Sequence, residues 1–273
     1  DEVTVVGNLE KNHTSNFFFA NYFVLPDASR MVSAPRYSRG VPIARPAARG
    51  IDTNARSADL SGIWRQMGTG EFGSLPGGPI GVAGGMGSLN LGNQTPARGL
   101  PLTELGQAEL AVFDVRDNPW FRCETRGLPG VINGTQEIVR QNEQEIVIRY
   151  QLLDIERIVH LDIIERPPQL DRSRLGHSIG WFEGETLIVD TALFEPVAWG
   201  IGAGIPSSVE KHIVERYSLV GEGNGLQIET MFEDPVYMTE PVEFVSSFVL
   251  DSGYQWQEYN CDPYASRRHL DVQ

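Results

Sequence analysis

The chain has 273 residues, of which 41% are hydrophobic and 21% are charged, as is typical of a soluble globular protein. Its formal net charge of -14 at pH 7 argues against nucleic acid and against an anionic membrane surface as partners, because both require a basic face. The longest apolar run, "NFFFANYFVLP" (16–26), is shorter than the roughly 20 residues of a spanning helix, so we predict no membrane span.

The first 58 residues are predicted to form an extended N-terminal arm. Residues 28–58 contain six arginines, three prolines and a single acidic residue, Asp52. Proline removes backbone donors, and so few large apolar side chains cannot build a core. We therefore expect the arm to bind another surface, either that of its own chain or that of a neighbouring subunit. The start at Asp1 rather than methionine is interpreted as a mature terminus left by signal-peptide cleavage.

Residues 59–273 are predicted to form a single barrel-like domain. It opens with "DLSGIWRQM", and the Gly-rich run over 68–100 is expected to be a long loop. A short helix is predicted over 103–114, with Thr103 as its N-cap. Helical spacing there is given by Leu102, Leu105, Leu110 and Phe113.

From residue 136 onward the pattern is that of short β-strands separated by turn signals. They read "QEIVRQN", "EQEIVIRYQLL", "ERIVHLDII", "HSIGWFE", "TLIVDTAL", "KHIVERYSLV", "GLQIETMFE", "VEFVSSFVL" and "YQWQEYNC". No helical pattern lies between them, which favours a mainly antiparallel meander. We predict an all-β fold, a lipocalin-like barrel or curled sheet of about 8–9 strands, because closure removes free edges. The "SGIW" segment is similar to the Gly-x-Trp that opens lipocalin-type barrels.

The stretch "GHSIGWFEGETLIVDT" (176–191) is predicted to be a β-hairpin with a two-residue turn at 184–185. That turn places His177 opposite Ala192, and it points the side chain of Asp190 to the other face of the sheet. The hairpin alone therefore does not make a His–Asp dyad. His177 keeps two interpretations, a structural one and a catalytic or ligand-binding one.

Several motifs occur in a fixed order along the chain: "DLSGIW", "GLPLTELGQAE", "RCETRGLPG", "EIVRQNEQEIVIRYQ", "GHSIGWFEGETLIVDT", "HIVERYSL", "EDPVYMTEPVEF" and "EYNC". With these motifs in this order, the chain resembles a family of uncharacterised exported bacterial proteins. The hallmark of that family is a Gly-His-Ser-x-Gly-x-Trp-Glu-Gly-Asp-Thr-Leu-x-x-Asp-Thr hairpin, and the resemblance covers residues 59 to 262. It implies a β-rich fold and export, and no particular reaction. The chain departs from the pattern at Phe182, at Glu185 and at Pro206-Ser207, where a Pro-His pair is expected.

Two strands carry the candidate chemistry. If the protein is an enzyme, the catalytic candidates are His177, His212 and Glu215, and the ligand-binding candidates are Trp181, Arg216 and Tyr217. A buried Glu215 is alternatively part of an ion pair with Arg149 or Arg216.

No metal site and no cofactor are predicted. His160 and Asp162 share a strand face, but two ligands do not make a site. The sequence contains no P-loop and no His-Glu-x-x-His motif.

Cys123 and Cys261 are the only cysteines, and an exported protein is expected to join them as a disulfide; the alternative is two buried free thiols. The leading functional prediction is a periplasmic or extracellular bacterial protein that serves as a structural or accessory subunit. It assembles with copies of itself or with a larger envelope complex through its arm and Gly-rich loop. The alternative is a barrel enzyme of the lyase, isomerase or hydrolase type, or a binder of a small, partly apolar molecule.

Overall fold

The computed structural model describes residues 58–66 and 100–268, apart from residues 133, 164, 167–169 and 203. The predicted N-terminal arm (1–58) and Gly-rich loop (68–100) fall outside these residues except at Ala58 and Leu100.

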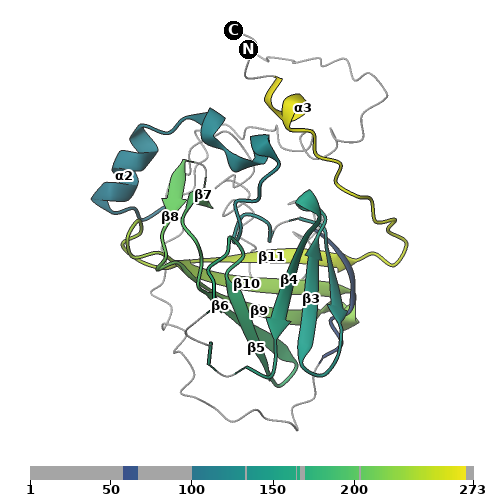
Figure 1. Ribbon diagram of the computed structural model, residues 1–273. Helices are drawn as coiled ribbons and strands as arrows, with labels where there is room; N and C mark the ends of the chain where they lie inside the picture. Colours follow the sequence, from purple (N-terminus) through teal and green to yellow (C-terminus); the bar gives the residue numbers. More distant parts are fainter. Residues whose placement is uncertain are drawn as a thin grey trace, which may run out of the picture. The chain divides into compact units, whose positions relative to one another are not determined.

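Nine strands form a closed barrel, which confirms the predicted all-β class (Figure 1). Their order around the barrel is β1-β11-β10-β9-β6-β5-β4-β3-β2. Closure comes from β1, which pairs antiparallel with β2 on one side and with β11 on the other. The strands are β1 (Gly62–Gln66), β2 (Gln136–Arg140), β3 (Glu145–Tyr150), β4 (Ile155–His160), β5 (His177–Glu183), β6 (Thr186–Ala192), β9 (His212–Val220), β10 (Gly225–Glu233) and β11 (Val242–Leu250).

The 176–191 hairpin has the predicted register. Glu183 pairs with Thr186, and His177 pairs with Ala192. Gly184 adopts φ 63° in the turn, a left-handed conformation that glycine reaches without steric cost.

The sheet departs from a simple antiparallel meander at one junction. Strands β4 and β5 pair in parallel, with Val159 opposite Ser178 and His160 opposite Ile179. The prediction of a consecutive antiparallel arrangement is wrong at this point. The 16 residues between the two strands allow the chain to return to the starting end before β5 begins.

Two further segments differ from the prediction. The predicted strands include no residue between 197 and 207, yet Ile205–Ser207 forms β8, which pairs with β7 (Val197–Gly202) in a separate two-stranded sheet. "YQWQEYNC" (254–261) was expected to be a strand and is irregular. Because β1 already pairs with β11, no free barrel edge remains for this segment.

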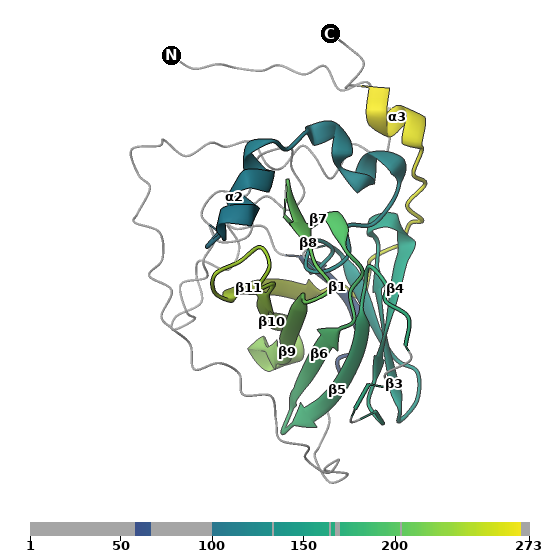
Figure 2. The same cartoon turned by 60° about the vertical axis from the view of Figure 1, so that its left-hand side comes forward.

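The predicted helix is present as α2 (Glu104–Ala111), and the Thr103 side chain accepts a hydrogen bond from the backbone N–H of Gly106 at 3.1 Å. It ends three residues before the predicted boundary. Figure 2 shows α2 beside the β7–β8 sheet, near one end of the barrel. The remaining helical segments are η3 (Val115–Asp117), η4 (Pro119–Arg122), η5 (Leu152–Asp154), η6 (Gly221–Gly223) and α3 (Pro263–Arg267).

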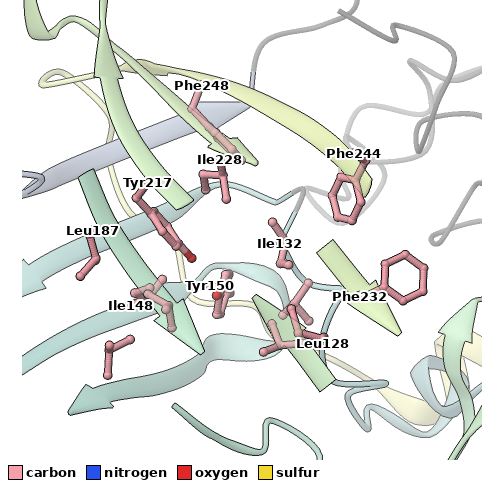
Figure 3. Close-up of a cluster of buried hydrophobic side chains, with 14 of the residues drawn as sticks. Leu128, Ile132, Ile148, Tyr150, Leu187, Tyr217, Ile228, Phe232, Phe244 and Phe248 are labelled. Atoms are coloured by element: carbon pink, nitrogen blue, oxygen red, sulfur yellow. The ribbon is translucent and has the colours of Figure 1, made fainter. Parts of the chain in front are cut away.

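The interior of the barrel holds the core. Alternate residues of the strands point inward, and Figure 3 shows Tyr150, Tyr217 and Phe248 as members of this buried cluster. Leu128 and Ile132, from the segment before β2, enter the same cluster and are fully buried. Burial of each such aliphatic side chain contributes about 1.5–3 kcal/mol. The segment before β2 therefore fills part of the barrel interior.

The predicted disulfide between Cys123 and Cys261 is formed, across a sequence separation of 138 residues and a Cα–Cα distance of 5.8 Å. It ties the irregular C-terminal segment to the end of η4. Among the residues that the structure describes, no helix is both long and apolar enough to span a membrane.

Candidate functional site

A polar network lies inside the barrel, centred on Arg157 of β4. Its Nη2 donates to Glu215 Oε2 at 2.5 Å and to Thr191 Oγ1 at 2.7 Å. Its Nε donates to Ser178 Oγ at 2.8 Å, and its Nη1 donates to the Tyr150 hydroxyl at 3.2 Å. The side chains of Arg157 and Glu215 are 2% and 0% exposed, so the ion pair is shielded from water.

Tyrosine hydroxyls complete this network. The Tyr217 hydroxyl donates to the second carboxylate oxygen of Glu215 at 2.8 Å. Burial raises the pKa of Tyr217 well above its usual value of 10, and the charge of Glu215 adds to the effect. Burial alone would lower the pKa of Arg157, but the charge of Glu215, the two neighbouring tyrosines and the hydrogen bond to Glu215 together outweigh it and raise that pKa well above its usual value. The Arg157 guanidinium therefore stays charged, and both tyrosines beside it stay neutral.

Glu215 thus belongs to an ion pair, but not with either arginine named from the sequence. Arg149 pairs instead with Glu137 and Glu156 at 3.1 Å each, and the Arg216 side chain lies 3.6 Å from Glu183. Arg149 and Arg216 occupy the outward-facing positions of their strands, so neither reaches the interior.

Two buried polar side chains border the network without a hydrogen-bond partner. Gln136 is 0% exposed and lies opposite Tyr150 in the β2–β3 register. Thr230 is 1% exposed and lies opposite Glu215 in the β9–β10 register. Neither the Gln136 amide nor the Thr230 hydroxyl finds a partner. The interior of the barrel is therefore both filled and unusually polar.

A second polar cluster lies on the outer face of β6, β9 and β10. The two ring nitrogens of His212 lie 3.0 Å from Asp190 Oδ2 and 3.3 Å from Glu233 Oε1. Arg166, from the connection before β5, donates to both the carboxylate and the backbone carbonyl of Asp190, and to the backbone carbonyl of His177. A histidine held between two carboxylates is suited to accept and release a proton.

The charges of this outer cluster reinforce one another. Burial alone would lower the pKa of His212, but the hydrogen bonds and charges of Asp190 and Glu233 outweigh it and raise that pKa above 6.5. Burial would raise the pKa of Asp190, but His212 and Arg166 together hold it below 3.8. The cluster therefore shifts His212 toward its protonated form and Asp190 toward its ionised form.

His177 belongs to a different arrangement. Its ring stacks on His160 with centroids 4.8 Å apart and an interplanar angle of 13°. Its Nδ1 is buried without a hydrogen-bond partner. Burial lowers the pKa of His177, and the neighbouring His160 and Arg166 lower it further. His177 is therefore held in its neutral form.

The candidate residues do not converge on one pocket. Glu215 and Tyr217 point into the barrel, whereas His212 and Arg216 of the same strand lie on its outer face. Trp181 also lies outside, packed against a small cluster formed by Ile188, Val214 and Met231. In the described part of the chain, no three or more His, Cys, Asp or Glu side chains are grouped to hold a metal ion. A surface hollow at one end of the barrel is lined by Ala58, Asp59, Ser61, Arg140, Asn142 and Glu143, none of them a predicted site residue.

Ser178 lies in a segment that also matches a nucleophile-elbow spacing, Gly-His-Ser-Ile-Gly (176–180). An elbow places its serine on a sharp turn between a strand and a helix. Here Ser178 lies within β5, 2% exposed, and its hydroxyl contacts Arg157 and Thr191. The spacing therefore does not make Ser178 an accessible nucleophile.

Sequence reasoning missed Arg157, Arg166 and Glu233 as members of these clusters. A signal for Arg157 does exist, because in "IERIVH" it occupies the same alternation as Ile155 and Val159. A charged residue at an apolar strand position indicates an interior polar partner. Arg166 lies in a segment without a strand pattern. Its contact with Asp190 depends on the tertiary structure, which the sequence pattern does not reveal.

No family model, no curated protein and no solved structure matches this chain.

Proposed function

We propose that this protein is a structural or accessory subunit, exported from a bacterial cell, that assembles with copies of itself or with a larger envelope complex. The observation that supports it most is that the barrel is filled by its own side chains. Trp64, Tyr150, Tyr217 and Phe248 are at most 1% exposed and occupy the interior. A filled barrel is a rigid scaffold whose interactions take place on its outside.

The segments proposed to make these interactions are residues 1–58 and 68–100. Residues 28–58 carry six arginines against one acidic residue, in a chain whose net charge is -14. Opposite charges on two such surfaces steer association and select the partner. A basic segment from one copy therefore suits the acidic barrel of another.

Export to the periplasm or the extracellular space is part of the same proposal. The Cys123–Cys261 disulfide supports it, because such bonds persist in oxidising compartments. The resemblance to exported bacterial proteins over residues 59 to 262 agrees with this proposal.

Substitution of the arm arginines in the full-length chain tests the assembly role. We expect the intact protein to elute as an assembly and a variant with Arg30, Arg36 and Arg45 changed to glutamine to elute as a monomer. The control changes Arg116, Arg122 and Arg267, which are exposed on the described surface, and removes the same charge. If both variants elute at the volume of the intact protein, the arginines of the basic segment are not needed for assembly, and the proposal is contradicted.

A second proposal is acid–base chemistry on a small, partly apolar molecule, as in a hydrolase, lyase or isomerase. The observation in its favour is His212, which lies between the carboxylates of Asp190 and Glu233. Turnover of a panel of small esters and lactones by the full-length protein tests the hydrolase form. Activity that disappears in His212→Asn and persists in His160→Asn supports it, and an inert protein contradicts it.

A further inference from the structure

A buried guanidinium without a hydrogen-bond partner lies near one end of the barrel. Arg126, in the segment between η4 and β2, is 1% exposed. Its Cζ lies 3.7 Å from the ring centroid of Trp120 and 5.8 Å from that of Trp199. None of its three guanidinium nitrogens has a hydrogen-bond partner. The two indoles offer their faces to the cation, but a ring face does not replace the hydrogen bonds that water makes to five N–H groups.

Other buried polar groups in this part of the fold include two without partners and a second cation. The Trp120 Nε1 and Ser207 Oγ atoms are buried and also lack partners. Lys211, 1% exposed, donates to the backbone carbonyls of Leu128 at 2.9 Å and of Gly200 at 3.3 Å. Lys211 thus links the segment that carries Arg126 to strand β7, which carries Trp199.

The acidic side chain whose charge acts on Lys211 already accepts several hydrogen bonds. Asp234 is 0% exposed and accepts hydrogen bonds from the backbone N–H and the hydroxyl of Ser208 and from the backbone N–H of Val236. The charge of Asp234 raises the pKa of Lys211 and so opposes part of the effect of burial. Burial lowers the pKa of Arg126 to about 9 and that of Lys211 to about 7. The region therefore combines two buried bases with one acid.

We propose that Arg126 binds a small monovalent anion of the halide class in this buried region. An anion supplies both missing features, since it accepts hydrogen bonds and carries the opposite charge. The ligand must be small because Arg126, Trp199 and Ser207 are each at most 3% exposed. Gly130 lies beside Arg126 and has no side chain. A Cβ built at Gly130 would lie 3.8 Å from Arg126 Nε, which is an ordinary contact distance.

Chloride-dependent thermal stability of the full-length, disulfide-bonded protein tests this site. Total sodium and ionic strength stay constant while gluconate, which is too large to be enclosed, is replaced by chloride. We expect a rise in Tm that reaches about 3–5 °C at ten times the chloride Kd and grows with the logarithm of chloride concentration beyond it. Arg126→Gln is expected to show no such rise. The control Arg116→Gln, at an exposed arginine that pairs with Asp114, should rise like the wild type.

An equal chloride response in Arg126→Gln and in the wild type overturns the proposal. If Arg126→Gln does not fold, crystals of the wild-type protein in sodium bromide decide the question through anomalous scattering. A bromide peak within hydrogen-bond distance of the Arg126 guanidinium supports the site. A map with no peak there overturns it.

Discussion

At the scale of single residues, the buried pair of Arg157 and Glu215 is the feature on which the barrel interior depends most. Each partner is costly to bury alone, and each becomes acceptable because the other supplies charge and hydrogen bonds. Ser178, Thr191 and Tyr150 accept or share the remaining guanidinium hydrogen bonds. Removal of one partner therefore damages the fold more than removal of both.

Glu215→Ala is expected to lower the free energy of unfolding by about 3–5 kcal/mol, because it leaves the Arg157 charge buried without its partner. The double variant Arg157→Met/Glu215→Leu should recover much of this loss. Urea denaturation measures both. The matched control, Glu137→Gln, breaks an exposed pair with Arg149 and should cost about 0–1 kcal/mol. Equal losses for Glu215→Ala and Glu137→Gln would mean that the interior pair is not shielded from water.

The stability of the fold depends on pH through His212, and the sign of this dependence follows from the direction of the His212 pKa shift. Its folded pKa lies above the value of 6.5, so its protonation favours the folded state. The stabilisation that protonation of His212 contributes is fully present below pH 6.5, and it is lost as the pH rises through the folded pKa. The wild type should therefore exceed His212→Asn in stability by more at pH 5.5 than at pH 9. Denaturant titrations at the two pH values measure the difference, and a gap independent of pH would contradict the assignment.

The sequence predicts much of where residues point and little of what they touch. Strand alternation correctly separates His212 and Arg216 from Glu215 and Tyr217. The partner of Glu215 could not be predicted, because Arg157 reaches it only after β4 and β9 are brought to the same interior by barrel closure. Partners on distant strands depend on the order of the strands, which alternation does not encode.

At the scale of elements, the 176–191 hairpin is the part that local sequence specifies best. Its turn residues and its alternation agree, so the register follows from a few neighbouring residues. The parallel β4–β5 pair is specified less well, because its connection runs over 16 residues without a strand pattern. The irregular 254–261 segment has a strand-like composition, yet barrel closure leaves it no partner.

Gly184 carries the hairpin turn, and its substitution tests this local specification. Gly184→Ala must place a Cβ at φ 63°, so we expect a loss of about 1–2 kcal/mol in stability. No atom outside the turn lies within 4 Å of that Cβ, so the cost would be conformational rather than steric. Thermal unfolding measures it. Gly253→Ala, at an exposed turn with ordinary contacts, is the control and should be nearly neutral.

At the scale of the whole molecule, one covalent bond joins segments far apart in the chain. The Cys123–Cys261 disulfide closes a loop that contains every barrel strand except β1. The double variant Cys123→Ser/Cys261→Ser should lose about 4–5 kcal/mol in unfolding free energy, chiefly through the greater freedom of its unfolded chain. Urea denaturation of the oxidised protein, the reduced protein and the variant compares the three. Reduced wild type and variant should coincide, and a variant as stable as the oxidised protein would contradict this role.

The proposal that the protein serves as a subunit of a larger assembly rests on three features. They are the filled barrel, the disulfide and the basic N-terminal segment. The most direct measurement is the mass of the protein purified from its native source, obtained by light scattering at physiological salt. The account predicts a mass of several times the 30.2 kDa of one chain, or a mass that includes other envelope proteins. A single species of one chain's mass across the accessible concentration range would contradict it.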